Sequence, residues 1–206
     1  MKFFRRAVGK PPKLGVLAGT FNPPTLAHLT LAREGLTHAE EVLFVLPRVF
    51  PHKPYEGASF EQRLEMLRRA VEDEPRYSIA ATDHGLFIDI AQDCRSAYGA
   101  HTNIAFLCGR DAAERIVNWD YGRPGAFQEM LGSFELMVVS RKGDYEPPPE
   151  LRHRIRTLSL PSGFDEVSAT AVRERIARGE PWENLVPASI IPLVREIYSR
   201  DDSPDA

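Results

Sequence analysis

Thr25 and His28 are the first residues whose types and spacing could do chemistry. They stand three apart in the stretch GTFNPPTLAH, residues 19–28, which follows the apolar run 14–18. If a helix begins at Thr25, a hydroxyl and an imidazole share its first turn, beside backbone N–H groups with a partial positive charge. Gly19 has no Cβ, so a ligand can approach the backbone there, and such a helix start suits a phosphate. From these residues alone, Thr25 could equally be only an N-cap and His28 a solvated side chain.

Alternating strands and helices must position these residues. Short apolar runs predict strands, and amphipathic stretches between them predict helices. Strands are expected at 14–18, 41–47, 77–82, 103–109, 134–141 and 155–160. Helices are expected at 25–36, 59–74, 86–98, 110–119, 168–179 and 187–199. This alternation predicts an α/β fold: a doubly wound, mostly parallel Rossmann-like sheet with helices on both faces.

The expected fold places three strand-to-helix junctions at the carboxyl ends of the strands. Ligands of open parallel sheets bind outside these ends. The junctions are Gly19–His28, Gly109–Asp111 and Val167–Arg173. Neither GxGxxG after a strand nor GxxxxGK[ST] occurs, so the sequence gives no fingerprint for a nicotinamide cofactor or a Walker-type phosphate loop. Residues 14–200 are expected to form a single domain, with 1–13 and 201–206 as flexible tails.

Composition narrows the class of protein. The 206 residues carry a net charge of −3, which argues against a nucleic-acid partner. No apolar run approaches the ~18 residues of a membrane span, so no membrane association is expected. Cys94 and Cys108 have no CxxC or CxxH spacing and support neither a disulfide framework nor a zinc site. A cytoplasmic protein that acts on small molecules is the expectation.

Two stretches carry a family resemblance. GTFNPPTLAH resembles the first signature of a nucleotidyltransferase superfamily, whose core is His or Thr, two residues and then His. VSATAVRERI, residues 167–176, resembles the second signature, Ile-Ser-Ser-Thr-x-x-Arg. HKP at 52–54, FLCGRDAAERIVNW at 106–119 and VVSRKG at 138–143 look like nicotinate or nicotinamide mononucleotide adenylyltransferases and occur in that family's order.

The resemblance covers residues 14–199 and implies a reaction. The family joins ATP and a pyridine mononucleotide, giving the dinucleotide and pyrophosphate, by direct in-line attack on the α-phosphorus. Mg²⁺ accompanies the ATP. The implied partners are therefore ATP and the mononucleotide, and the chain could form a homo-oligomer.

The resemblance also implies roles for individual residues. His28, Thr25 and Arg173 match the catalytic positions. ATP binding falls on Gly19, Thr20, Phe21, His28, Gly109, Asp111, Ser168, Thr170 and Arg173. Substrate binding falls on Trp119, which would stack on the pyridine ring, and on the cations Lys53 and Arg141. The alternatives are an N-cap at Ser168 with a solvated Arg173, a core position for Trp119, and surface positions for Lys53 and Arg141.

Two departures from the family leave the substrate open. Thr25 stands where the mononucleotide enzymes usually carry His, so it offers a hydroxyl without a positive charge. The segment DHGLFIDI, residues 83–90, stands where bacterial nicotinate enzymes usually show Ser-Tyr-Thr. Nicotinate and nicotinamide both stay possible. So do another phosphate acceptor such as pantetheine phosphate, CTP as the donor, and a nucleotide-binding module without turnover.

Overall fold

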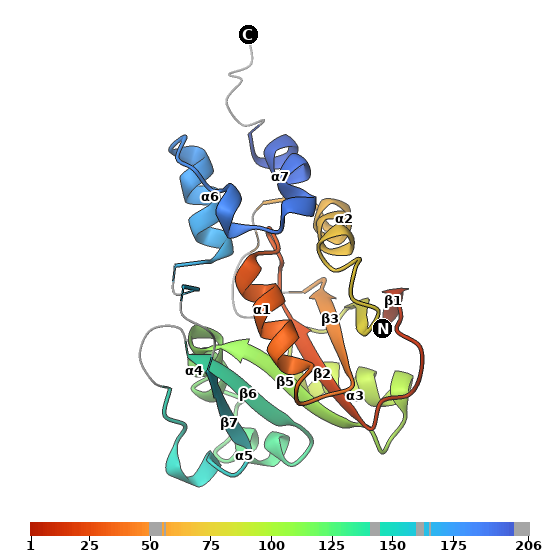
Figure 1. Cartoon of the computed structure of the whole chain (residues 1–206). Coiled ribbons are helices and arrows are strands. Elements are labelled where there is room, and N and C mark those ends of the chain that lie inside the picture. The colour runs from red at the N-terminus through yellow and green to blue at the C-terminus, as the bar shows by residue number, and fades with distance from the viewer. Residues whose placement is uncertain (50–54, 56, 141–144, 160–162, 165, 200–206) are drawn as a thin grey trace.

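A mostly parallel sheet forms the centre of the protein (Figure 1). The structure is a computed structural model that describes residues 1–49, 55, 57–140, 145–159, 163–164 and 166–199. Within these residues the sheet has seven strands in the order β1-β4-β3-β2-β5-β6-β7. The strands are β1 (Lys2–Arg5), β2 (Lys13–Ala18), β3 (Glu41–Pro47), β4 (Tyr77–Thr82), β5 (Asn103–Gly109), β6 (Glu135–Ser140) and β7 (Ile155–Ser159). β1 pairs antiparallel with β4, and all other neighbours pair in parallel.

The six parallel strands coincide with the six apolar runs of the sequence, and the predicted doubly wound, Rossmann-like fold is confirmed. β3 and β4 are buried along their whole length. Strands buried on both faces need helices on both sides, which is why these runs are apolar throughout and do not alternate with polar residues.

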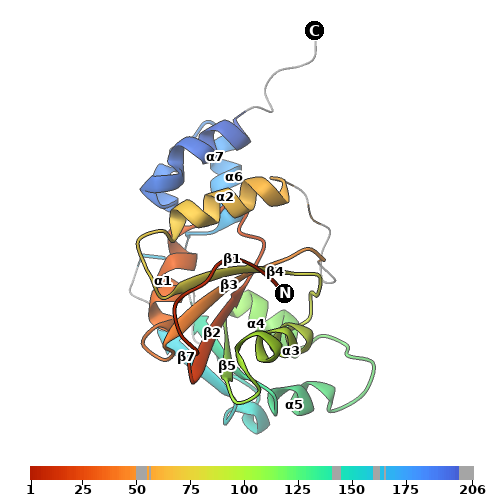
Figure 2. The same cartoon turned by 90° about the vertical axis from the view of Figure 1, so that its right-hand side faces the viewer.

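Helices cover the two faces of the sheet (Figure 2). One side carries α1 (Leu26–Gly35) and α2 (Phe60–Ala70), and the other carries α3 (Phe87–Tyr98), α4 (Arg110–Val117) and α5 (Ala126–Leu131). The remaining helices are α6 (Ala169–Ala177) and α7 (Ile191–Tyr198), with short 3₁₀ turns η1 (Pro149–Leu151), η2 (Glu183–Leu185) and η3 (Ala188–Ile190). In Figure 1, α6 and α7 stand above the sheet, on the side to which β3 points.

The core follows this layering. One apolar cluster lies between the sheet and α3, α4 and α5, and a second lies between the sheet and α1 and α2. A third joins α2 to α6 and α7 through Met66, Val172 and Val194, each fully buried. The C-terminal helices are thus packed on the body of the protein by an apolar contact of their own.

The N-terminal segment differs from the prediction of a flexible tail at 1–13, which is wrong for residues 2–5. β1 pairs with β4 at the edge of the sheet. The Arg5 guanidinium donates to the carbonyl oxygens of Val71 (2.7 Å) and Glu74 (2.8 Å). Phe3 and Phe4 pack against different apolar clusters, because successive side chains of a strand point to opposite faces. The sequence analysis also missed the six-residue helix α5. The tail predicted at 201–206 lies outside the described residues.

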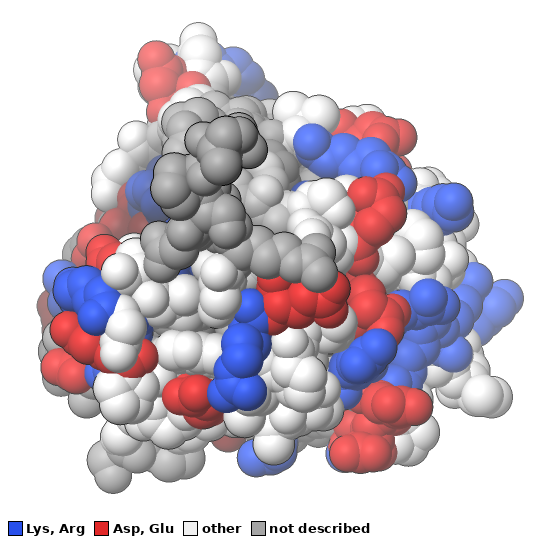
Figure 3. Space-filling view, turned by 90° about the horizontal axis from the view of Figure 1, so that it is seen from above, with Lys and Arg blue, Asp and Glu red and all other residues white. Residues whose placement is uncertain are grey.

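Charged side chains of both signs are interspersed on the face shown in Figure 3. Among the described residues, no helix is long and apolar enough to cross a membrane.

Candidate active site

β2 and β5 lie side by side, and the chain leaves them in opposite directions. β2 continues through α1 to β3 on one side, and β5 continues through α4 to β6 on the other. A switch point of this kind is where doubly wound sheets bind their ligands. Gly19 follows β2 and Gly109 ends β5, so two of the three predicted junctions meet there.

The loop that leaves β2, residues 19–24, is packed tightly. The Gly19 N–H donates to the carbonyl oxygen of Val45 at 3.1 Å. Phe21 is 1% exposed, and its φ of +49° is a left-handed conformation that is unfavourable for a bulky residue. Its ring packs against those of Phe44 and His28, with centroids 5.7 and 5.2 Å away. Backbone strain of this kind persists only where packing imposes it, and it is common at ligand-binding loops.

Thr25 and His28 form a capping box at the start of α1. His28 Nδ1 accepts the backbone N–H of Thr25 at 3.0 Å, and it lies 2.8 Å from the Thr25 hydroxyl oxygen. Because Nδ1 accepts a backbone N–H, the hydrogen-bond pattern assigns the proton of the neutral ring to Nε2. Thr25 is fully buried, so its hydroxyl is directed at the histidine and not at solvent. Thr25 stands at the N-cap position of α1, and its hydroxyl helps to fix the orientation of the imidazole.

The second signature contacts this loop through Arg173. Its Nη1 donates to the carbonyl oxygens of Asn22 and of Ala169, the latter at 3.1 Å. Its Nη2 lies 3.5 Å from the Thr170 hydroxyl oxygen. The Ser168 hydroxyl accepts the N–H of Ala171 at 3.0 Å, so the N-cap alternative holds for Ser168. Arg173 itself is half-buried and contacts the loop, so the solvated alternative does not hold for it.

Asn22 connects this loop to two further parts of the chain. Its side-chain oxygen accepts the N–H of Ala58 at 3.2 Å and the hydroxyl of Tyr198 in α7. Burial raises the pKa of the Tyr198 phenol, which therefore stays protonated and can donate. Gly57 has a φ of +126°, and a Cβ there would lie 2.2 Å from Asn22 Nδ2. Glycine is therefore required at position 57 by both conformation and space.

Arg63 is a residue of this site that the sequence analysis missed. It lies on α2, is 3% exposed, and donates from Nη1 to the carbonyl oxygen of Thr20 at 2.9 Å. Its guanidinium lies over the Tyr55 ring, 4.5 Å from the centroid. Burial lowers the pKa of Arg63. The signal in the sequence was a cation one turn before Leu67 on the apolar side of the expected helix, a position where a lone arginine needs a partner.

The Gly109–Asp111 junction lies at the start of α4. Gly109 is the N-cap residue of this helix, and Asp111 is exposed on its first turn. Arg110, where the family usually has a small residue, pairs with Glu114 at 2.7 Å.

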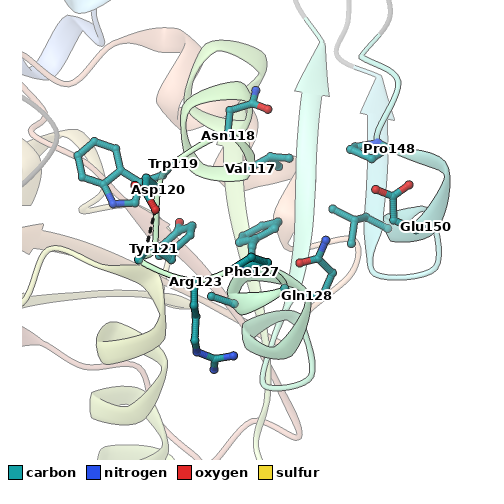
Figure 4. Close-up of a pocket in the computed structure, with 15 residues that line it drawn as sticks. Val117, Asn118, Trp119, Asp120, Tyr121, Arg123, Phe127, Gln128, Pro148 and Glu150 are labelled. Atoms are coloured by element: carbon teal, nitrogen blue, oxygen red, sulfur yellow. Dashed lines mark hydrogen bonds between the residues drawn. The ribbon is translucent and has the colours of Figure 1, made fainter.

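Trp119 follows α4 and is 40% exposed, so the core alternative does not hold. It lines an open pocket of about 470 Å³ formed by Val117–Gln128, Pro148 and the turn Glu150–Leu151. In Figure 4 its indole points away from Phe127 and Gln128 on the far side of that pocket. None of the signature residues lines the pocket, so this hollow is separate from the junctions described above.

Comparison with known proteins gives the family. The family model described as cytidylyltransferase-like matches residues 16–175. The chain belongs to this family.

Its relatives specify the branch. A probable nicotinate-nucleotide adenylyltransferase of Solibacter usitatus is 30% identical, over 92% of this chain and 97% of its own. One of Carboxydothermus hydrogenoformans is 28% identical, over 86% and 92%. The nicotinic acid mononucleotide adenylyltransferase of Plasmodium falciparum, solved with NaAD, superposes with a TM-score of 0.68 at 16% identity, over 89% of this chain and 95% of that one. The resemblance to the mononucleotide adenylyltransferases is confirmed, and the chain is a nucleotidyltransferase.

In the candidate site, Arg173 Nη1 thus joins α6 to residues 19–28 by its hydrogen bond to the carbonyl oxygen of Asn22. Ser168 and Thr170 lie on the same first turn of α6, and Gly109 and Asp111 flank the switch point. Lys53 and Arg141 lie outside the described residues. Among the residues that the structure describes, no group of three or more His, Cys, Asp or Glu side chains is placed to hold a metal ion.

Proposed function

We propose that this nucleotidyltransferase transfers the adenylyl group of ATP to the phosphate of nicotinate mononucleotide, forming nicotinate adenine dinucleotide and pyrophosphate. The observation that carries the proposal is the contact between the two signatures, in which Arg173 holds the carbonyl of Asn22 three residues before the Thr25–His28 capping box. The two relatives described as probable nicotinate-nucleotide adenylyltransferases support the choice of acceptor.

In this proposal His28 acts on the triphosphate. Its Nδ1 is held by Thr25, so in the neutral ring Nε2–H is the other donor, on the first turn of α1. A phosphate oxygen of ATP would accept this N–H together with the N–H groups at the helix start. Thr25 acts mainly by holding the ring, which explains how a neutral residue can stand at this position.

The chemistry is one displacement. An oxygen of the mononucleotide phosphate forms a bond to the α-phosphorus of ATP, and the bond from that phosphorus to the bridging oxygen of pyrophosphate breaks. No covalent enzyme intermediate is needed, so the protein contributes positioning and stabilisation of the negative charge on the phosphoryl oxygens. His28 and the first turn of α1 supply donors at the transferred group.

Arg173 and the start of α6 would serve the leaving group. The guanidinium hydrogen-bonds to backbone carbonyls of Asn22 and Ala169, which are weaker partners for a cation than a phosphate. Bound pyrophosphoryl oxygens would therefore compete for it. Thr170 is exposed on the same turn, and Gly109 and Asp111 are proposed to hold the adenosine end.

Mg²⁺ would accompany ATP. Such ions are commonly held by substrate phosphates, water and one or two carboxylates, and a dedicated protein cage is not required. Its contribution would be to neutralise the charge of the triphosphate. Trp119, Lys53 and Arg141 are proposed for the acceptor, and self-association of the chain stays a prediction.

The test is a panel assay of pyrophosphate release. ATP and CTP are each combined with nicotinate mononucleotide, nicotinamide mononucleotide or pantetheine phosphate, with and without Mg²⁺. The expected result is fastest release with ATP and nicotinate mononucleotide in the presence of Mg²⁺. Faster release with CTP or pantetheine phosphate would replace this function with one of the alternatives. No release with any pair, from folded protein that binds ATP, would favour a binding module.

A further inference from the structure

The last residue of α7 reaches the loop that precedes the Thr25–His28 capping box. The Tyr198 hydroxyl donates to the side-chain oxygen Oδ1 of Asn22, although the two residues are 176 positions apart in the chain. The same oxygen accepts the backbone N–H of Ala58 at 3.2 Å. Asn22 is 3% exposed, so protein donors take the place of water at its side-chain oxygen.

The packing of α7 does not depend on this hydrogen bond. Ile190 and Val194 are fully buried in the apolar cluster that joins α7 to α2 and α6, and the Tyr198 ring packs against the same cluster. In Figures 1 and 2, α7 lies next to α2. Because a phenyl ring would keep these contacts, the hydroxyl is an additional connection from the helix to Asn22.

Asn22 is thus held at two points by the C-terminal helices. Its backbone oxygen accepts from Arg173 Nη1 of α6, and its side-chain oxygen accepts from Tyr198 of α7. The two donors differ in kind. The guanidinium is a cation, for which the oxygens of a phosphate are stronger partners than a carbonyl. The phenol is neutral, and burial raises its pKa, so it stays a protonated donor. A bound triphosphate therefore competes for Arg173 far more than for Tyr198.

This difference becomes important during the reaction. Under the proposed function, negative charge builds up on the pyrophosphate as its bond to the α-phosphorus breaks, and Arg173 is then drawn most strongly to the leaving group. Its hydrogen bond to Asn22 weakens at the step in which the loop has to be fixed. Asn22 lies three residues before Thr25, whose capping box orients His28. A displacement of about 1 Å at a reacting centre can cost about a hundredfold in rate.

We propose that Tyr198 is a positioning residue for the reaction: through Asn22 it holds residues 19–24 in place while Arg173 turns from the Asn22 carbonyl to the leaving pyrophosphate. Tyr198 acts through Asn22 and not by contact with the reacting atoms. The inference rests on the proposed function, in which Arg173 serves the leaving group. The last helix then contributes to turnover without supplying a group to the chemistry.

The test compares two tyrosine hydroxyls that donate to side-chain oxygens. Tyr198→Phe removes the donor to Asn22 and keeps the ring. Tyr98→Phe is the matched control, because the Tyr98 hydroxyl donates to the Glu41 carboxylate, and Glu41 begins β3 at the opposite end of the sheet from residues 19–24. The measurements are kcat and KM for ATP and nicotinate mononucleotide by Mg²⁺-dependent pyrophosphate release, with the melting temperature of each variant.

Tyr198→Phe is expected to lower kcat about threefold to tenfold, the effect of losing one neutral hydrogen bond, with both KM values within about twofold. Tyr98→Phe should lower the melting temperature at least as much and leave kcat within about twofold. A kcat of Tyr198→Phe within about twofold of the wild type, with only the melting temperature lowered, would overturn the proposal. So would a rise in KM for ATP with a normal kcat, because the hydroxyl would then serve binding and not turnover.

A double-mutant cycle tests whether the hydroxyl acts through Asn22. Asn22→Ala removes the shared acceptor, so adding Tyr198→Phe to it should change kcat by less than about twofold. A further loss as large as in the single variant would overturn the proposal. If Asn22→Ala does not fold, the comparison of Tyr198→Phe with Tyr98→Phe decides alone.

The same variants can be compared with any donor and acceptor that the wild-type enzyme converts. Conversion of a different pair would overturn the proposed function, and the kcat values for that pair would still decide the role of Tyr198. No conversion of any pair would overturn both.

Discussion

Two substitutions can separate the structural role of His28 Nδ1 from the proposed catalytic role of Nε2. His28→Ala removes both ring nitrogens. His28→Asn removes only Nε2, because the asparagine oxygen occupies the position of Nδ1 and can still accept the backbone N–H of Thr25. If one nitrogen serves the fold and the other serves the reaction, the two variants should be equally slow and unequally stable.

The magnitudes follow from the hydrogen bonds. In His28→Ala the fully buried Thr25 loses its 3.0 Å backbone acceptor and the partner of its hydroxyl at 2.8 Å. Leaving buried polar groups unsatisfied costs about 1–3 kcal/mol. For a chain of this size, each kcal/mol lowers the melting temperature by about 2–4 °C, so a loss of roughly 2–12 °C is expected. His28→Asn should lose less than about 2 °C. Both should reduce kcat roughly 10²–10³-fold, the effect of removing one charge-stabilising donor.

The assay is Mg²⁺-dependent pyrophosphate release at saturating substrates, beside thermal unfolding of the three proteins. A His28→Asn variant with kcat within threefold of the wild type would refute the role of Nε2. Equal melting temperatures for the two variants would refute the capping box.

Three further substitutions test other parts of the site. Thr25→Val keeps the shape of the buried side chain and removes the hydroxyl, so kcat should fall about tenfold while the backbone bond to His28 stays; normal kcat with a lower melting temperature would make Thr25 a cap only. Arg63→Met fills the space of the buried arginine without its donors. KM for ATP should rise about tenfold, because the Thr20 carbonyl loses its hydrogen bond. A loss of stability with a normal KM would instead show that Arg63 is purely structural. Trp119→Ala should raise KM for the mononucleotide about twofold to tenfold, the effect of a lost aromatic stack, with KM for ATP unchanged; equal changes in both would remove Trp119 from the acceptor site.

The strands could be predicted from the sequence because their signal is local. Apolar runs such as 41–47 are buried on both faces, and nothing in a tertiary contact had to be known to find them. The signal of an N-cap is also local: the Ser59 hydroxyl accepts the N–H of Gln62 at 3.2 Å, and the Gln62 side chain accepts the N–H of Ser59 at 2.7 Å. Propensity and pattern coincide at these positions with the final structure.

The remaining features depend on partners far away in the chain. β1 forms because Phe3, Phe4 and Arg5 find contacts on the sheet edge and α2, which a short basic segment does not reveal. Arg63 donates to the carbonyl oxygen of Thr20, which lies 43 residues away in the chain. The signature residues could be found because their spacing is local. The contact of Arg173 with Asn22 could not be predicted in this way, because it spans 151 residues.

The hydrogen bonds of Asn22 have a consequence for the order in which parts of the protein can fold during synthesis. Asn22 is synthesised before its partners Arg173 and Tyr198, which lie 151 and 176 residues further along the chain. Domains begin to form from the N-terminus while synthesis continues. The strands that precede α6 can therefore begin to assemble on the ribosome before the loop has these partners, and the candidate site is completed only after α7 has been synthesised.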